Sequence, residues 1–306
     1  LYTPIIFNNL MLILLYQSIY FLQKKHCYLV VDEEYQLKKY HYKKFIIFVL
    51  LLICITGVIY SIYNILLWKA DTNSIDDQVD LINETTEVTE IADSEKTQPT
   101  NPPPESTNPY RDYIKIPLID VNLVELKKLN SDTKGWIQVR GTNINFPFVQ
   151  SKNNDFYLTH SFDKTRNQAG WVFLDYRNDI NSLSNNSILY AHGRVGGTMF
   201  GTLKNIISND WYSNKDNYII RISAEHENTL WQVFSVYKIE TTNDYLQTSF
   251  SNNADYQSFL EMIKGRSALN FDVSLNSEDK ILTLSTCYNK TEKVVMHAKL
   301  IKKEMK

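Results

Sequence analysis

Hydrophobic and polar residues are distributed unevenly along the chain, and the longest apolar run lies near its start. Residues 45–67 form 23 consecutive positions without a charged side chain, FIIFVLLLICITGVIYSIYNILL. As a helix, this run would be about 34 Å long, which is enough to cross the hydrocarbon core of a bilayer. We therefore expect a transmembrane anchor over residues 45–68 rather than the core helix of a soluble protein.

The residues that flank this run predict its orientation. KKYHYKK at 38–44 is basic, and Trp68 is of a type that favours the membrane interface. Because positive charge marks the cytoplasmic side, the chain after residue 68 should be extracellular, in a single-pass membrane protein. No small-residue cleavage site is evident, which favours an uncleaved anchor over a signal peptide. Within the N-terminal segment 1–44, the apolar residues 1–22 leave two interpretations open, a second span or an over-extended start.

Polar residues dominate the next segment, 69–110. It is acidic at first and then proline-rich, with NPPPES at 101–106, and it lacks the apolar density that a core requires. We expect a disordered linker over this segment. The folded extracellular domain should then cover residues 111–306, which is a usual size for one domain.

Within residues 111–306 the pattern predicts one early helix and then mainly strands. DVNLVELKKLN at 120–130 places Leu123, Leu126 and Leu129 on one helical side, and SFLEMIKG at 258–265 predicts a helix inserted between two strands. β-branched and aromatic runs separated by turn residues predict strands at 135–141, 143–150, 170–176, 185–192, 217–223, 229–240, 280–287 and 293–301. Eight strands with few helices favour a mainly β fold, a closed β-barrel without exposed sheet edges.

Composition and charge add little to this picture, but the cysteines change it. The net charge of -2 gives no sign of a nucleic-acid partner, and no metal-binding or phosphate-binding motif is found, so we expect no cofactor. Of the three cysteines, Cys54 lies in the predicted span and Cys27 lies before it. Cys287 is then the one extracellular cysteine, without a disulfide partner. A lone thiol in an oxidising compartment is a liability unless it has a chemical use.

The position of Cys287 suits a nucleophile. In KILTLSTC (280–287), strand alternation puts Ser285 and Cys287 on one face, and Cys287 stands where the strand ends and a polar turn begins. Such a position is exposed enough to attack and rigid enough to aim. A thiol attacks as the thiolate, so it needs a base or a positive charge nearby.

The best candidate for the base among six histidines is His192. It ends the strand NNSILYAH and precedes the glycine-rich turn GRVGG, a common placement for an active-site residue. The others are in cytoplasmic, loop or mid-strand positions, where a surface or packing role is the simpler interpretation: His26, His41, His160, His226 and His297.

Two segments together resemble the signature of a known family. TLSTC at 283–287 and ILYAHGRVGGTMFGTL at 188–203 resemble the paired motifs of the sortases, membrane-anchored cysteine transpeptidases of Gram-positive surfaces. LKKLNSDTKGWIQVRGTNINFPFVQSKNNDFYL at 126–158 and GWVFLDYRND at 170–179 are similar to class B sortases in particular. The resemblance covers about residues 112–301 and implies an eight-stranded β-barrel.

The resemblance also implies a mechanism, with Cys287 as nucleophile and His192 as its acid/base partner. The thiolate would attack the threonine carbonyl of a sorting signal near the C-terminus of a surface protein and form a thioester. An amine of a peptidoglycan precursor would then take over the acyl group. Class B relatives commonly accept signals of the Asn-Pro-x-Thr type.

One family element is not matched. Sortases carry an arginine on the strand after the nucleophile, where this chain has Lys293 in EKVVMH. Lysine is a point charge that lacks the planar two-pronged contact of arginine, but it can stabilise an oxyanion electrostatically. Arg194 is a substitute if its turn folds inward, and an oxyanion held by backbone N–H groups alone is a third option.

Further roles can be suggested for residues near these motifs, and those of the groove residues follow from the resemblance. Ser285 and Thr286 would line one wall of the substrate groove, and Asn154 and Leu158 the opposite wall, although Leu158 also suits a core position. Arg194 is a further candidate for substrate binding. Tyr190 shares a face with His192 by strand alternation and would buttress it.

Several other functions compete with this interpretation. The separation of His192 from Cys287 disfavours an L,D-transpeptidase, and a papain-like protease would have the reverse order. A pilus-polymerising sortase is the nearest rival, but the Asp-Pro-aromatic lid motif of class C is absent from residues 101–113. A membrane-tethered β-barrel adhesin without enzymatic activity remains the alternative of a different class.

Overall fold

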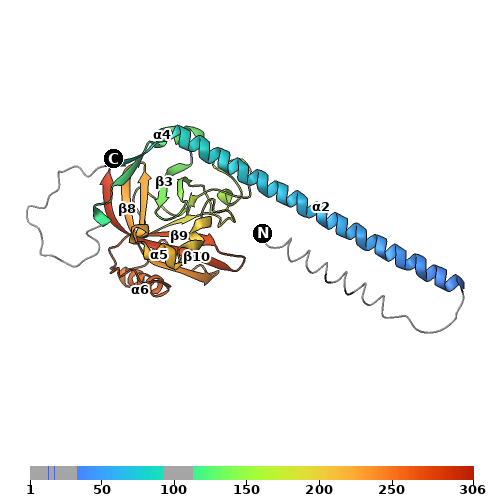
Figure 1. Ribbon diagram of the computed structural model, residues 1–306. Coiled ribbons are helices and arrows are strands. Elements are labelled where there is room, and N and C mark those ends of the chain that lie inside the picture. The colour runs from blue at the N-terminus through green and yellow to red at the C-terminus, as the bar shows by residue number, and fades with distance from the viewer. Residues whose placement is uncertain (1–12, 14–16, 18–32, 92–112) are drawn as a thin grey trace, which may run out of the picture. The chain divides into compact units, whose positions relative to one another are not determined.

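The computed structural model describes residues 13, 17, 33–91 and 113–306 (Figure 1). The chain divides into two compact units, residues 1–70 and 71–306. Apart from positions 13 and 17, the segment 1–22 lies outside the described residues, as does Cys27, so the question of a second span stays open.

Helix α2 (Glu33–Thr85) begins in the first unit and ends in the second. Its apolar residues are exposed on all sides, as Phe45, Leu51, Ile59 and Leu66 illustrate. Among the described residues, one stretch is long and apolar enough to cross a membrane, with a mean hydropathy of 2.9 in its most apolar window. A helix that is apolar all round and unburied by protein suits a lipid environment.

The prediction of a disordered linker from residue 69 is wrong for residues 69–91. Helix α2 continues to Thr85, and strand β1 (Val88–Ile91) pairs antiparallel with β2 (Leu118–Val121). Ile75 and Ile82 are buried, and Val79 packs against the same core. Because they are spaced by four and three residues, the three side chains lie on one helical face. The acidic residues between them make this apolar pattern hard to detect in the sequence. The folded unit that contains the barrel therefore starts near residue 71, and residues 92–112 lie outside the described part.

The second unit contains a closed barrel of eight strands (Figure 1). Around the barrel the order is β10-β8-β7-β3-β4-β5-β6-β9, and β9 pairs with β10 to close it. The pairs β4–β5 and β6–β9 are parallel, and the others are antiparallel. The bounds are Thr133–Val139 for β3, Asn145–Val149 for β4, Phe173–Leu174 for β5, Asn186–Tyr190 for β6, Ile219–Ala224 for β7, Glu227–Glu240 for β8, Ile281–Cys287 for β9 and Glu292–Met305 for β10. The predicted eight-stranded barrel is confirmed.

The helices lie outside the barrel and cover its strands. Helix α6 (Asn253–Gly265), at the bottom of Figure 1, joins β8 to β9 and buries Tyr256, Phe259, Leu260 and Ile263. Its N-terminus is capped by Asn252, whose side chain accepts from the N–H of Asp255. The helix predicted before the nucleophile strand is therefore present. The remaining short helices are α4 (Leu123–Leu129), α5 (Asn209–Ser213), η1 (Phe156–Leu158), η2 (Gly201–Asn205) and η3 (Lys215–Tyr218).

Helix α4 differs from its prediction in one residue. Leu123 and Leu126 are buried, but Leu129 is 45% exposed. The helix ends at Leu129, and Asn130 after it is extended and donates its N–H to the carbonyl of Leu126. The last leucine therefore falls at the fraying end of the helix, where the barrel no longer covers it.

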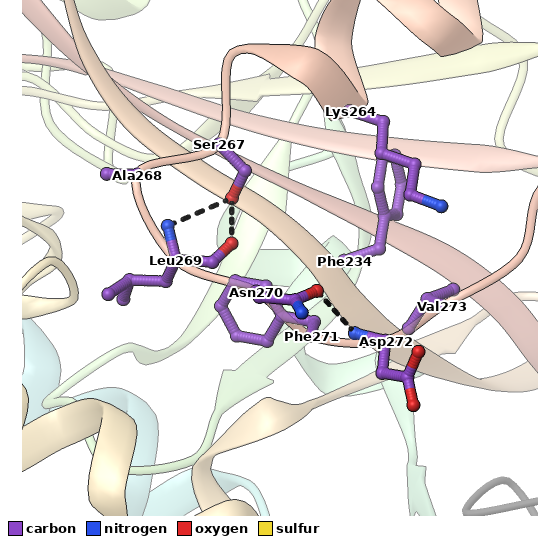
Figure 2. Close-up of a pocket in the computed structure, with 9 residues that line it drawn as sticks. All are labelled: Phe234, Lys264, Ser267, Ala268, Leu269, Asn270, Phe271, Asp272 and Val273. Atoms are coloured by element: carbon purple, nitrogen blue, oxygen red, sulfur yellow. Dashed lines mark hydrogen bonds between the residues drawn. The ribbon is translucent and has the colours of Figure 1, made fainter.

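A cavity of about 300 Å³ opens beside the segment that follows α6 (Figure 2). Its lining residues are Phe234, Lys264, Ser267, Ala268, Leu269, Asn270, Phe271, Asp272 and Val273. None of the residues predicted to act in catalysis or substrate binding lines this cavity.

Candidate active site

Cys287 is the last residue of β9 and is partly exposed. The preceding residues are buried, so that the strand holds the cysteine at a fixed point on the rim of the barrel. Across the β9–β10 pair, Cys287 lies directly opposite Lys293, and the Nζ of Lys293 donates to the Sγ of Cys287 at 3.0 Å. An ammonium at this distance stabilises negative charge on sulfur.

The turn between these strands explains why Lys293 faces the sulfur. The side-chain oxygen of Asn289 accepts from the N–H groups of Thr291 and Glu292, and the N–H of Tyr288 donates to the carbonyl of Glu292. This short, self-bonded turn fixes the register of the hairpin.

His192 follows β6, which runs parallel to β9 with Tyr190 opposite Ser285. The pairing continues beyond the strand, since the hydroxyl of Thr286 donates to the carbonyl of Ala191 at 2.8 Å. A Cβ at Gly193 would lie only 2.4 Å from the carbonyl oxygen of Cys287. Glycine at 193 is thus required for the histidine segment to lie against the end of β9, and this brings the backbone of His192 beside Cys287.

The ring of His192 is held by the segment 157–170. Its Nε2 lies 2.8 Å from the carbonyl oxygen of Leu158, so Nε2 carries a proton and donates it in this hydrogen bond. A Cβ at Gly170 would be 2.4 Å from the carbonyl of Tyr157 and 3.1 Å from Cδ2 of His192, and φ there is +62°. A glycine is therefore needed where the segment passes the ring.

The electrostatics of His192 favour the neutral ring at neutral pH. Burial lowers the pKa of His192, the hydrogen bond to Leu158 partly offsets this, and the charges of Arg194 and Lys293 lower it further. A neutral ring that donates from Nε2 has its lone pair on Nδ1. Such a ring can accept one proton and return it, as an acid/base partner must.

The predicted groove residues are fixed by partners within the barrel unit. The hydroxyl of Ser285 lies 2.9 Å from that of Tyr245, and Thr286 is bonded to Ala191. Asn154 donates to the carboxylate of Asp175 and accepts from the N–H of Tyr176. Leu158 is half-buried and contributes its carbonyl to His192. Their contact with substrate stays a prediction.

Arg194 does not take the place of the family arginine. Arg194 is 5% exposed, and its Nη2 donates to the hydroxyl of Thr72 in α2 at 2.6 Å. Met199 is fully buried and forms a bridge with Gly193, so the turn directs Arg194 toward the helix. Lys293, and not Arg194, is bonded to the sulfur. Tyr190 donates to Asp175, in keeping with a supporting role.

Further residues near the site carry no strong signal in the sequence. Lys204 in η2 places its Cε 2.6 Å from the Cβ position of Gly193, and burial lowers its pKa while Cys287 partly offsets the shift. The carboxylate of the buried Asp175 accepts two hydrogen bonds of 2.8 Å from the guanidinium of Arg177. Arg177 also donates to the carbonyl of Leu246. The one feature of the sequence that could have indicated this ion pair is the opposite charge of Asp175 and Arg177, two residues apart. Within the described ranges, no group of three metal-binding side chains is found.

A closed β-barrel with a cysteine at the end of one strand and a histidine after the neighbouring strand is an arrangement that suits a barrel enzyme of the cysteine class. The sortase domain family matches residues 137–301, and the chain belongs to the sortase family. Within that family, the chain is a class B sortase, because the relatives that it matches in sequence are sortase B proteins.

Two relatives are similar in sequence. Sortase B of Staphylococcus aureus (strain NCTC 8325 / PS 47) is 39% identical over 181 residues, which is 58% of this chain and 73% of that protein. Sortase B of Listeria monocytogenes serovar 1/2a is 33% identical over 189 residues, 59% of this chain and 74% of that protein.

Solved structures agree with these relatives. The Staphylococcus aureus sortase B–substrate complex matches with a TM-score of 0.55 and 38% identity, over 58% of this chain and 83% of that one. Sortase B of Clostridium perfringens matches with a TM-score of 0.56 and 35% identity, over 59% of this chain and 100% of that one. The resemblance to class B sortases is thereby confirmed, and the chain is a sortase transpeptidase.

Proposed function

We propose that this sortase cleaves a sorting signal after its threonine through a thioester on Cys287 and transfers the protein to an amine of a peptidoglycan precursor. One observation carries the assignment of the nucleophile: the Cys287 sulfur lies 3.0 Å from the Lys293 ammonium, beside the segment of His192. Further support comes from the relatives named sortase B.

In the first half-reaction, the thiol proton of Cys287 passes to His192, and the thiolate attacks the threonine carbonyl. The new C–S bond puts negative charge on the carbonyl oxygen. Lys293 is close enough to the sulfur to stabilise this oxyanion when the carbonyl reaches it. When the oxyanion collapses, the C–N bond breaks, and His192 gives its proton to the leaving amine.

In the second half-reaction, the acceptor amine attacks the thioester. His192, now neutral, takes a proton from the amine as the new C–N bond forms. The C–S bond breaks, and the thiolate of Cys287 is regenerated beside a protonated His192. The pair then returns to its starting state by one proton transfer. Each step uses one histidine alternately as acid and base.

The substrate and the location follow from the same proposal. The donor is a surface protein with a sorting signal of the Asn-Pro-x-Thr type, and the barrel faces the outside of the cell. The basic segment 38–44 and the apolar stretch of α2 support this orientation. The signal peptide would contact Asn154, Ser285 and Thr286. These side chains are now hydrogen-bonded within the barrel unit, so the groove would have to rearrange to free them for the peptide.

The full chain in detergent micelles provides the test. A labelled peptide with an Asn-Pro-x-Thr signal is incubated with triglycine or with a lysine-bearing peptide. We expect the triglycine conjugate, its loss in Cys287→Ala, and full activity in Cys54→Ala as the matched cysteine control. Conjugation to the lysine peptide alone would contradict wall anchoring and favour a pilus polymerase. Absence of cleavage, together with no labelling of Cys287 by a vinyl sulfone, would favour a non-enzymatic protein.

A further inference from the structure

The last turns of α2 contact both segments that hold His192. We infer that the contacts of Asp71 and Thr72 position His192 for proton transfer, so that these two are positioning residues for the reaction. The inference rests on the role of His192 in the proposed function. It assigns a role in the reaction to the part of α2 that directly follows the apolar stretch.

The first contact fixes the turn that follows His192. Nη2 of Arg194 donates to the hydroxyl of Thr72 at 2.6 Å, and the guanidinium is almost fully buried. Asp71 and Asp76 add favourable charge to it. Since a buried charge depends strongly on its partners, this bond holds Arg194 in one place. The N–H of Phe200 donates to the carbonyl of His192, which ties the turn back to the histidine itself.

The second contact fixes the segment that binds the ring. The backbone carbonyl of Asp71 accepts from Asn167 at 3.0 Å, and its carboxylate accepts from the N–H of Gln168 at 3.3 Å. About two turns further along the helix, the side chain of Gln78 accepts from the N–H of Asp163 at 3.2 Å. Asp163, Asn167 and Gln168 lie between Leu158, which accepts from the imidazole, and Gly170, where an added Cβ would crowd Cδ2 of the same ring.

The two contacts are joined by one rigid element. Ile75 and Ile82 anchor the helix in the core, so Asp71 and Thr72 have fixed positions relative to the barrel. Because Thr72 and Asp71 are adjacent, one displacement of this helix end would move both supports of His192. Proton transfer is sensitive to such displacements, and small misplacements far from the chemistry lower rates markedly.

The experiment compares Thr72→Val, which removes the hydroxyl and keeps the shape, with Thr72→Ser, which keeps the hydroxyl. Both are made in the full chain and assayed with the labelled peptide and triglycine. We expect kcat to fall about tenfold in Thr72→Val with KM nearly unchanged, and to be restored in Thr72→Ser. Asn73→Ala and Asp77→Asn, both exposed on the same helix, serve as controls and should retain the kcat of the parent.

A parental kcat in Thr72→Val would overturn the inference. If the thermal midpoint of this variant is lowered while its kcat is parental, the contact is purely stabilising. Failure of the proposed function is a separate result: it would appear as parental activity in His192→Ala, whatever Thr72→Val does.

Discussion

Two histidines of the barrel unit, the fully buried His297 and the partly buried His192, have opposite surroundings. His297 lies in the middle of β10, with no exposed surface, and both ring nitrogens are bonded: Nδ1 to the hydroxyl of Thr283 at 2.8 Å and Nε2 to that of Tyr237 at 2.9 Å. His192 lies beyond the end of its strand, and among the described residues the one hydrogen bond of its ring is that of Nε2 to the carbonyl of Leu158. Burial lowers the pKa of both rings.

The difference shows what would separate a structural histidine from the acid/base histidine that we propose. Burial and a lowered pKa are common to both, so neither property identifies the active site. The distinguishing features are a ring nitrogen left for proton transfer and a position at the rim, where a substrate can reach it. His297 has neither, because rigid strand residues occupy both of its nitrogens.

The largest expected effect concerns His192. We predict that His192→Ala lowers kcat/KM by about 10³-fold, because general acid/base catalysis in both half-reactions is lost. The thermal midpoint should stay close to that of the parent. His226→Ala, an exposed histidine in the β7–β8 turn, is the control and should keep full activity. If His226→Ala lost as much activity as His192→Ala, the assignment of His192 as the acid/base residue would be wrong.

The opposite pattern is expected for His297. His297→Ala should lower the free energy of unfolding by roughly 3 kcal/mol, since it leaves a cavity and two buried hydroxyls without their partner. Chemical denaturation measures this value, and activity per folded molecule should be retained. If the variant keeps its stability but loses turnover, then the two histidines have been assigned the wrong way round.

The pH dependence of stability sharpens the same contrast. Burial lowers the pKa of His297 to about 3, whereas the unfolded chain titrates near 6.5. Below pH 6.5 the unfolded state binds a proton that the folded state does not. The contribution of His297 to the free energy of unfolding should therefore fall by about 1.4 kcal/mol per pH unit as the pH decreases below 6.5. Denaturation at pH 7, 6 and 5 checks this, and a smaller slope is expected in His297→Ala; equal slopes would refute the assignment.

The smallest of these effects concerns Lys293, whose charge acts on His192 and on the sulfur. Lys293→Ala should lower turnover at least about tenfold, through weaker stabilisation of the thiolate and the oxyanion. Lys293→Arg should retain or raise turnover, because arginine adds a planar two-pronged contact. Steady-state rates with the same peptide measure both effects. Near-parental activity of Lys293→Ala would show that Lys293 has no role in the mechanism.

Much of the fold could be predicted from the sequence because barrel strands are local patterns. Each of the eight predicted strand ranges overlaps an observed strand, and α6 appears where its amphipathic pattern indicated. The opposition of Cys287 and Lys293 also follows from a short turn between two predicted strands. Such features depend on residues near one another in the chain.

The parts that could not be predicted depend on distant contacts. The helical end at 71–85 is polar enough to resemble a linker, and it folds because three apolar side chains meet the barrel. The direction of Arg194 depends on Thr72, which lies 122 residues earlier. The bonds of His297 come from two other strands, so the sequence alone could indicate a packing role but not the network.

The most direct test of the account is the mass of the enzyme during turnover. The full chain is mixed with an Asn-Pro-x-Thr signal peptide without an acceptor amine, quenched in acid and digested. We predict that the peptide up to its threonine is attached to the fragment that contains Cys287 and is released by hydroxylamine. An adduct on any other residue, or cleavage of the peptide without an adduct on Cys287, would contradict the account.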